Sequence, residues 1–348
     1  MKDIRWERFP LLAILPHARS WLTLQAALGL ASNTIAAYGR ALEDYLAFCA
    51  RNSIEVKAVT REQLATYVRD LTRRPSGQGA TVRRIDSKAG LANATLRLRL
   101  TAVRLYYDYL IEEGLRDTNP VGRGRYTASK GFGGQRSRCL IPAYHRLPWI
   151  PTDDEWRGVL EVARSEPSRN RMMLALAYDA GLRREELCSL ETSDIDPSQR
   201  LLRIRAETTK NRQERVVPYS EASGELYAAY LRHRSTLSRA SGPVFLSESR
   251  RNYAQPVTIW TWSKVIARLA VRSDLPRLTT HTMRHLCLTD LARAGWDIHE
   301  IARFAGHRHT QTTLLYIHLS GRDLAAKFSR DMTTIHTWRT QMTSEVFG

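Results

Sequence analysis

The chain has 348 residues, of which 43% are hydrophobic, so it is long enough to bury a full core and allows two domains. Its formal net charge is +18, and residues 1–150 carry 24 Lys and Arg against 12 Asp and Glu. Most of the basic residues are arginines, whose planar guanidinium suits phosphate, so nucleic acid is favoured as partner over a merely soluble basic surface. Binding to a membrane surface is the competing interpretation. No run approaches the ~18 apolar residues that cross a bilayer, so we expect no membrane protein.

Residues 1–28 are interpreted as an N-terminal extension that is too short for an independent fold. Their apolar stretch, FPLLAILPHARSW, is interrupted by Pro10 and Pro16, and no small-residue cleavage pattern follows, so a signal peptide is not expected. The four cysteines are scattered without a Cys-x-x-Cys pair, which argues against a disulfide or zinc-finger framework. Together these features favour the cytoplasm.

Residues 29–121 contain three stretches with helical periodicity. The segment NTIAAYGRALEDYLAFCA, residues 33–50, repeats apolar side chains at helical spacing after an Asn–Thr pair suited to cap a helix. Further helices are predicted over residues 61–74 and 93–114. Between them, PSGQGATVRRIDSKAG interrupts the pattern with Pro, Gly and basic residues, which predicts an exposed basic loop.

Residues 122–150 are interpreted as a basic interdomain linker, because residues 122–147 contain six Lys or Arg and no acid. The second domain, residues 151–348, begins at Thr152, which precedes three acids in a helix-start pattern. RLLRIRA and ERVVPYS predict a β-hairpin between helical segments. The sequence contains no Gly-rich phosphate loop, so nucleotide-driven chemistry lacks support.

Four patches of the second domain concentrate groups that bind phosphate or transfer protons. Each patch alone has an ordinary explanation, such as a helix-surface charge paired at i,i+3 or a packed core tyrosine. The patches are GLRREEL with Arg183 and Glu186, TTKNRQERVVP with Lys210, HTMRH with His281 and Arg284, and GHRHTQTTLLYIH with His307 and Tyr316.

In order and spacing, these patches resemble the tyrosine recombinase, or phage integrase, family. The resemblance covers the second domain, and more loosely the helical first domain with its NTIAAY opening. It implies a mainly α fold with a small β-sheet, in which a helical, SAM-like core-binding domain precedes a mixed α/β catalytic domain. Departures are small: Met283 stands where leucine is more usual, and FAGH replaces the commoner LGH.

The resemblance implies a site-specific DNA recombinase that cleaves and rejoins DNA through a 3′-phosphotyrosyl bond, with Tyr316 as the nucleophile. Charge builds on the nonbridging phosphate oxygens in the transition state, so Arg183 and Arg284 are expected to clamp them, with a further hydrogen bond from His307. We expect nearby arginines to favour the Tyr316 phenolate and His281 to accept its proton. Lys210 would protonate the leaving 5′-oxygen, and Glu186 would support the site.

No cofactor, ATP or metal ion is expected for this chemistry. His281 and His285 are four residues apart and would face the same side of a helix, but HTMRH lacks the Glu that follows the first His in zinc proteases. No residue is therefore assigned as a metal ligand.

Double-stranded DNA is the expected partner, held by both domains closing around it as the family implies. The candidates for phosphate contact are Arg83, Arg84, Lys88, Arg97, Arg104, Arg123 and Arg125. The chain after Tyr316 repeats apolar residues at helical spacing, and the resemblance implies that this tail links four protomers on synapsed DNA. We also expect association with the nucleoid and allow for accessory DNA-binding proteins.

The biological role is less constrained than the chemistry. The loop at residues 75–90 and the long linker favour an integrase or transposase of a mobile element over a chromosome or plasmid dimer resolvase, which tends to be more compact. A type IB topoisomerase or telomere resolvase shares the chemistry. A catalytically silent DNA-binding subunit is disfavoured because all six catalytic residue types are present.

Overall fold

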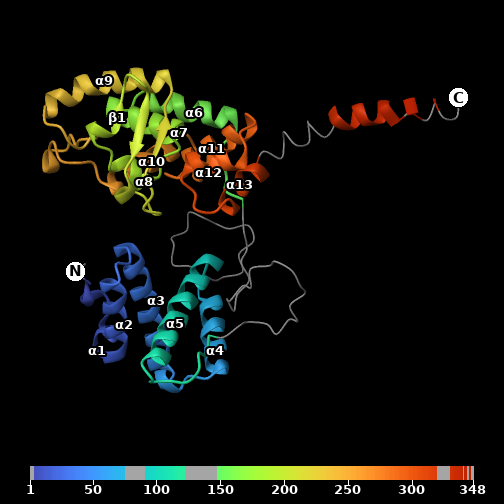
Figure 1. The fold of residues 1–348 in the computed structure, drawn as a ribbon. Helices are drawn as coiled ribbons and strands as arrows, with labels where there is room; N and C mark the ends of the chain where they lie inside the picture. The colour runs from blue at the N-terminus through green and yellow to red at the C-terminus, as the bar shows by residue number, and fades with distance from the viewer. Residues whose placement is uncertain are drawn as a thin grey trace. The chain divides into compact units, whose positions relative to one another are not determined.

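The computed structural model describes residues 4–74, 91–121 and 147–319, together with 330–339 and positions 341, 342 and 345. The chain divides into two units, Met1–His145 and Arg146–Gly348 (Figure 1). Each unit has its own hydrophobic core. The division falls inside the predicted linker at 122–150, most of which lies outside the described residues.

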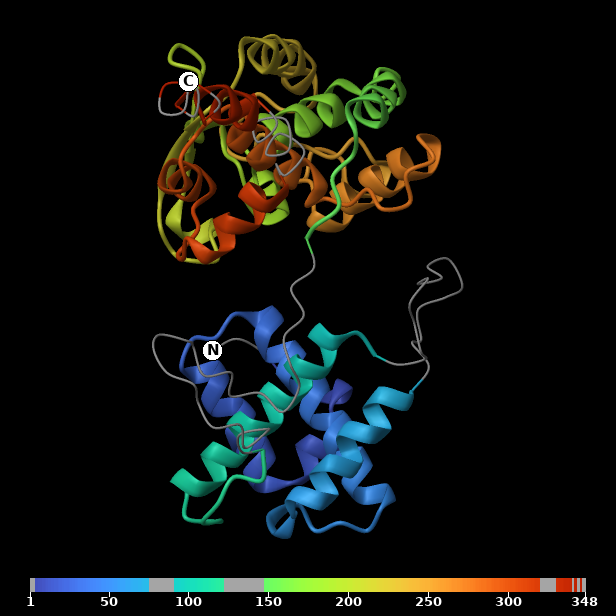
Figure 2. The same ribbon diagram turned by 90° about the vertical axis from the view of Figure 1, so that its right-hand side faces the viewer.

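The first unit is a helical bundle. In both ribbon views its two longest helices, α3 and α5, run side by side (Figures 1 and 2). Their facing sides are aromatic, and the hydroxyls of Tyr45 and Tyr107 lie 2.7 Å apart in the core. The helices are α1 (Pro10–Ile14), α2 (Pro16–Ala27), α3 (Ser32–Arg51), α4 (Arg61–Arg73) and α5 (Asn93–Glu112).

The segment interpreted as an N-terminal extension contributes to this core. Helices α1 and α2 pack against α3, and α2 also packs against α5. Leu12, Trp21 and Leu22 are fully buried in the same cluster as the side chains of α3 and α5. Pro10 and Pro16 each occupy the first turn of a helix, where proline is well tolerated.

The three helices predicted in the first unit are present as α3, α4 and α5. The predicted Asn–Thr cap of α3 is wrong: the N-cap is Ala31, which makes no side-chain cap bond, and both residues lie in the first turn. Helix α4 has the stronger start, because Thr60 and Gln63 form a reciprocal capping box. The predicted basic loop at residues 75–90 lies outside the described residues.

The second unit is mixed α/β. Helix α6 begins after Thr152, which forms a capping box with Glu155, as the sequence predicts. Its helices are α6 (Asp153–Ala163), α7 (Ser168–Asp179), α8 (Arg184–Cys188), α9 (Glu221–Leu237), α10 (Ile259–Arg272), α11 (Thr282–Arg293), α12 (Ile298–Ala305) and α13 (Gln311–Leu319).

The chain between α8 and α9 forms a small antiparallel sheet with strand order β1-β2-β3. The predicted hairpin is confirmed as β2 (Leu201–Ile204) and β3 (Arg215–Pro218), in a register that pairs Leu202 with Val217 on the buried face. The additional strand β1 (Ile195–Asp196) was not predicted, because two residues carry no readable period. The predicted fold class, mainly α with a small sheet, is confirmed.

Helix α11 organises the part of this unit that carries the predicted catalytic residues. It packs against α7, α12 and α13, and its Met283 and Leu288 are fully buried. Residues from GLRREEL, HTMRH and the last histidine–tyrosine segment are thereby brought together around one helix. None of the helices in the described part of the chain is both long and apolar enough to cross a membrane.

Candidate active site

The first arginine of the site, Arg183, is the N-cap residue of α8 and is tied to Glu186 one turn later. Its backbone N–H donates to Glu186 Oε2 at 2.9 Å, and its guanidinium donates to Oε1 at 2.7 Å. A second arginine, Arg215 on β3, binds both oxygens of the same carboxylate through its two terminal nitrogens, at 3.1 and 2.8 Å. Glu186 is therefore shared by two guanidiniums.

The Glu186 carboxyl is ionised although it is only 1% exposed. Burial alone would raise its pKa, but hydrogen bonds and charge from Arg215 and Arg183 outweigh it and lower the pKa to about 2. Removing one arginine from such a buried group would leave charge uncompensated, which is costly in a low-dielectric interior. Glu186 thus fixes the first arginine at the site.

The second predicted arginine, Arg284, reaches the site from α11 and is 3% exposed. Its guanidinium donates to the carbonyl oxygens of Gly181 and Ala305 and lies 3.0 Å from Nε2 of His307. Burial and the nearby Arg183 lower its pKa to about 10, so it is still fully charged at neutral pH. The segments before α8 and after α12 are held together by this one side chain.

His307 follows α12 directly after Gly306, which closes the helix in a left-handed conformation at φ 62°. Because a guanidinium only donates, Nε2 must accept from Arg284, which places the ring proton on Nδ1, 2.9 Å from the Thr313 hydroxyl. Burial and the positive charge of Arg284, Arg183 and Arg215 lower the pKa of His307 to about 3. The imidazole is therefore neutral at physiological pH.

Gly306 has two reasons to be glycine. Its φ of 62° is unfavourable for any side chain, and an added Cβ would lie 3.0 Å from Arg215 NH1 and 3.2 Å from its Cδ. We expect Gly306→Ala to lower the free energy of unfolding by more than the ~1–2 kcal/mol of left-handed strain alone. Gly295→Ala is the matched control, since Gly295 has φ 89° and nothing within 4 Å of the added carbon. Urea unfolding of both variants measures the difference, and equal losses would mean that Arg215 yields freely.

Tyr316 lies on α13 and is 3% exposed. Its ring stacks on that of His307, with centroids 6.0 Å apart. Its hydroxyl lies 3.0 Å from Nδ1 of His285, within hydrogen-bond distance. The positive charges of Arg284 and Arg183 are close enough to act on the phenol.

The phenol is not ionised in this arrangement. Arg284 and Arg183 lower the pKa of Tyr316, as the sequence predicts, but burial has the larger effect and the pKa is raised overall. Burial and the charge of His281 and Arg284 lower the pKa of His285 to about 4, so its imidazole is neutral. A neutral phenol and a neutral imidazole thus face each other.

Two predicted residues lie at the edge of this cluster. His281 is the N-cap residue of α11; its side chain is exposed, and its ring centroid is 6.3 Å from that of His285. Desolvation and nearby arginines lower the pKa of His281, against the opposing effect of Glu185. Lys210 is exposed in the loop between β2 and β3, and its neighbour Asn211 anchors that loop by donating to the Gly306 carbonyl oxygen at 3.1 Å.

Comparison with known proteins identifies the family of the chain. The sequence profile of the phage integrase family matches residues 152–322, and that of the phage integrase N-terminal SAM-like domain matches residues 19–114. This chain belongs to the phage integrase family of tyrosine recombinases. The first matched range contains all six predicted catalytic residues, and the second begins inside α2.

The similar proteins include recombinases of the Xer type and proteins of transposons. The tyrosine recombinase XerD of Halalkalibacterium halodurans is 28% identical over 86% of this chain and 92% of its own length. Transposase A from transposon Tn554 of Staphylococcus aureus is 26% identical over 87% of both chains. Among solved structures, DNA-bound XerH recombinase has a TM-score of 0.65 at 17% identity over 85% of this chain and 79% of its own. The Tn1549 transposon integrase has a TM-score of 0.62 at 17% identity over 86% and 94%.

The recombinase's predicted DNA contacts are described only in part. Arg97 and Arg104 lie half-buried on α5, and the Arg97 Nε is buried without a hydrogen-bond partner in the described structure. The other candidates fall outside the described residues: Arg83, Arg84, Lys88, Arg123 and Arg125.

Metal ligation was not predicted for this recombinase. Within the described ranges, no three His, Cys, Asp or Glu side chains are grouped so as to hold a metal ion. The expectation of metal-free chemistry stays a prediction, which the EDTA assay below tests.

Three residues of the tyrosine recombinase site were missed by the sequence analysis: Arg215, His285 and Thr313. Arg215 was counted only as a residue of the hairpin, and His285 was weighed only as a zinc ligand. The one available signal was the i,i+4 spacing of His281 and His285, which places both on one helix face. Their contacts with Glu186, Tyr316 and His307 depend on elements far apart in the chain.

Proposed function

We propose that the site described above performs the recombinase chemistry with Tyr316 as nucleophile. The observation that carries this proposal is the setting of Tyr316: its hydroxyl contacts Nδ1 of His285, its ring stacks on His307, and the charge of Arg284 acts on the phenol. A core tyrosine would be expected among apolar neighbours, whereas this one lies among groups suited to phosphate binding and proton transfer.

In the proposed reaction, Arg183 and Arg284 bind the nonbridging oxygens of the scissile phosphate. Preorganised donors of this kind stabilise the charge that builds in the transition state. His307 joins them once Arg284 turns to the phosphate, because the Thr313 hydroxyl can donate to Nδ1 as well as accept from it. The ring proton can then reside on Nε2, and this N–H donates a hydrogen bond to the phosphate.

Bond making and breaking are then balanced by two proton transfers. The Tyr316 oxygen attacks phosphorus as its proton passes to Nδ1 of His285, the imidazole that it already contacts. The sequence assigned this role to His281, which we place one step farther out, beside His285. The 5′-oxygen leaves with a proton from the Lys210 ammonium, and the phosphotyrosyl bond keeps the energy of the broken strand for rejoining.

A single assay tests the role of Tyr316 as the nucleophile. Wild-type protein is incubated in EDTA with nicked, end-labelled DNA from its genetic surroundings, and SDS-resistant adducts are isolated. We expect an adduct whose trypsin-trimmed peptide carries the nucleotide on Tyr316, joined to a 3′-phosphate. An adduct on another residue, or specific DNA binding without any adduct, would contradict the proposed catalytic roles.

The biological role that we propose is integration, excision or transposition of a mobile element. Its support is the similarity to the Tn554 transposase over most of both chains. Chromosome or plasmid dimer resolution is the second candidate, since XerD is similar over a comparable span. We further propose action on duplex DNA in the cytoplasm at the nucleoid, with accessory DNA-binding proteins where the element supplies them.

We propose that the active form is a homotetramer on synapsed DNA, linked by the C-terminal tail. The described tail helix, residues 330–339, exposes Ile335 and Trp338, and Met342 beyond it is also exposed. Leu324 and Phe328, which begin the predicted apolar stripe, lie outside the described residues. A tail with exposed large apolar side chains needs an apolar receptor.

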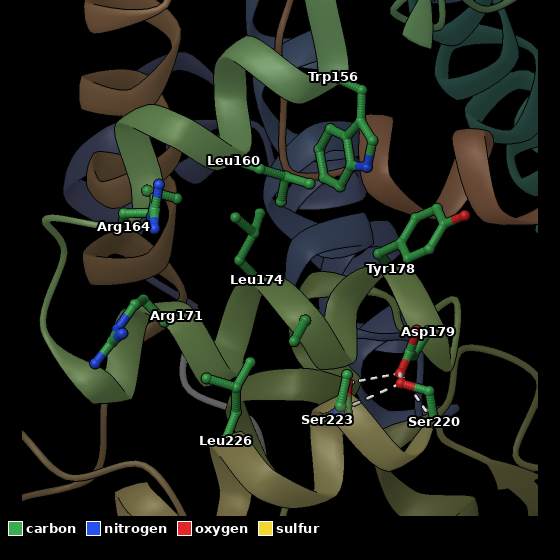
Figure 3. Close-up of a pocket in the computed structure, with 13 residues that line it drawn as sticks. Trp156, Leu160, Arg164, Arg171, Leu174, Tyr178, Asp179, Ser220, Ser223 and Leu226 are labelled. Carbon is green, nitrogen blue, oxygen red and sulfur yellow. Dashed lines mark hydrogen bonds between the residues drawn. The ribbon is translucent and has the colours of Figure 1, made fainter.

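A suitable receptor lies in a groove of about 400 Å³ among α6, α7 and α9 (Figure 3). Its walls are mostly apolar, from Trp156, Leu160, Leu174 and Leu226. The groove therefore offers an apolar surface to a segment from a neighbouring protomer.

Substitution at the mouth of the groove tests this assembly. We expect Leu160→Arg to abolish the tetrameric protein–DNA complex because it puts a charge where the tail would pack, while cleavage of a single nicked site continues. Leu160 is 45% exposed, so the change does not disturb the core. Val271→Arg, at an 81% exposed position outside the groove, is the control. Mass photometry of the complexes gives the result, and normal assembly of Leu160→Arg would place the receptor elsewhere.

A further inference from the structure

Arg215 differs from the two arginines assigned to the phosphate in that each of its guanidinium nitrogens donates to a protein acceptor. All three guanidinium nitrogens have a protein acceptor: NH1 and NH2 bind Glu186, and Nε donates to the Phe304 carbonyl oxygen at 3.0 Å. Its side chain is 8% exposed. Because each of its guanidinium nitrogens already donates to a protein acceptor, Arg215 has no nitrogen left over to bind a substrate.

Arg183 binds the same carboxylate less completely. Its guanidinium contacts Glu186 through NH1 alone, and its NH2 makes only a 3.2 Å hydrogen bond to the Gly306 carbonyl oxygen. Its side chain is 19% exposed, more than twice the value for Arg215. Of the two arginines on Glu186, Arg183 is the one that can rotate toward a ligand.

This rotation creates an electrostatic problem that Arg215 solves. When Arg183 engages a phosphodiester, its charge is shared with the ligand, and Glu186 loses part of its compensation at a position 1% exposed. An uncompensated buried carboxylate would hold Arg183 back and repel the incoming phosphate. The bidentate pair of Arg215 with Glu186 does not depend on Arg183. It therefore keeps the carboxylate neutralised while Arg183 engages the phosphate.

We propose that Arg215 is a positioning residue of the recombinase: it neutralises Glu186 so that Arg183 can turn to the scissile phosphate. The same side chain also packs against Gly306 and binds the last turn of α12, directly before His307. It therefore links strand β3 to two of the groups that meet the phosphate. The inference rests on the proposed role of Arg183 and concerns how that role is sustained.

The test is a double-variant cycle on the rate of adduct formation at saturating nicked DNA, in a single turnover. We expect Arg215→Met to slow adduct formation about 10- to 100-fold, the usual effect of removing an outer partner of a catalytic group, with unchanged DNA affinity. Adding Glu186→Gln to Arg215→Met should restore part of the rate, because the carboxylate that needed compensation is gone. Arg215→Lys keeps the charge but loses the bidentate geometry, so its rate of adduct formation should lie between those of wild type and Arg215→Met.

The pH profile separates this role from simple support of the fold. In Arg215→Met the pKa of Glu186 should rise, so its rate relative to wild type should improve as the pH falls and the carboxyl becomes protonated. Arg203→Met is the control, because Arg203 pairs with Glu214 at 2.8 Å on the exposed face of the same hairpin. Thermal melting verifies that each variant is folded, and Arg215→Lys carries the test if Arg215→Met is not.

The outcomes are distinguishable from failure of the proposed catalytic site. Tyr316→Phe is run in parallel, and if wild type forms no Tyr316-dependent adduct, the catalytic proposal fails and this inference falls with it. With the adduct established, a wild-type rate for Arg215→Met would overturn the inference. A double variant no faster than Arg215→Met, with a flat pH ratio, would also overturn it and reduce Arg215 to a structural residue.

Discussion

Tyr316→Phe should form no covalent DNA adduct while binding its DNA site as wild type does. The substitution removes the only oxygen of the side chain, and with it the atom that would attack phosphorus. We expect a loss of about 10⁴-fold or more, the scale found when a covalent nucleophile is deleted. The assay is SDS-resistant adduct formation on nicked DNA in EDTA, with DNA affinity measured separately.

Tyr230→Phe is the matched control for this experiment. Tyr230 is a buried tyrosine of the same unit, and its hydroxyl binds the backbone of Val244 and Leu246. Both variants lose a buried hydroxyl, at a cost of about 1–3 kcal/mol where the partner is left unsatisfied. Below the melting temperature only Tyr316→Phe should lose cleavage. An adduct with Tyr316→Phe would mean that another residue attacks.

The sequence was sufficient to find the residue types of this site but not their contacts. Arg183, Arg284, His307 and Tyr316 could be located because their spacing follows a family pattern. Which histidine meets Tyr316 could not be known, because it depends on how α11 and α13 pack. The direction of the Tyr316 pKa also required the structure, since its burial competes with the arginine charge that the sequence does reveal.

A similar limit applies to the fold. Long amphipathic helices such as α3 and α5, and the β-branched hairpin, carry periods that the sequence analysis could read. Helix α1 has five residues and β1 has two, so neither contains enough repeats to be recognised. The buried role of Arg215 was hidden for another reason: a charged residue in a strand is ordinarily read as solvent-facing. In β3, Arg215 lies on the same face as the buried Val217, and its pairing with Glu186 shows what it contacts there.

Arg284→Lys should lower the rate of adduct formation about 10²- to 10³-fold, as the loss of a preorganised transition-state donor does. Arg284 binds the carbonyl oxygens of Gly181 and Ala305 and the ring of His307 with one planar group. A lysine ammonium cannot reach all three positions and still contact a phosphate. We therefore expect some loss of stability as well, with a lower melting temperature.

The pH dependence of this variant identifies the cause of its defect. Burial and neighbouring positive charge lower the pKa of Arg284 to about 10, which leaves an arginine charged. A lysine starts from a pKa near 10.4, so the same surroundings would lower its pKa toward neutral pH. Since only the protonated form stabilises the transition state, the rate of Arg284→Lys relative to wild type should fall as the pH is raised from about 6.5 to 9.

Arg234→Lys provides the comparison for both effects. Arg234 is 6% exposed, and it binds the backbone carbonyl oxygens of Pro243, Val244 and Ala240. Its replacement should lower the melting temperature, while the cleavage rate of the folded protein and its pH ratio to wild type stay constant. If the rate of Arg284→Lys relative to wild type were also independent of pH, its defect would come from lost packing. A residue that stabilises the negative charge developing on the phosphate does so only when it is protonated, so its contribution must change with pH.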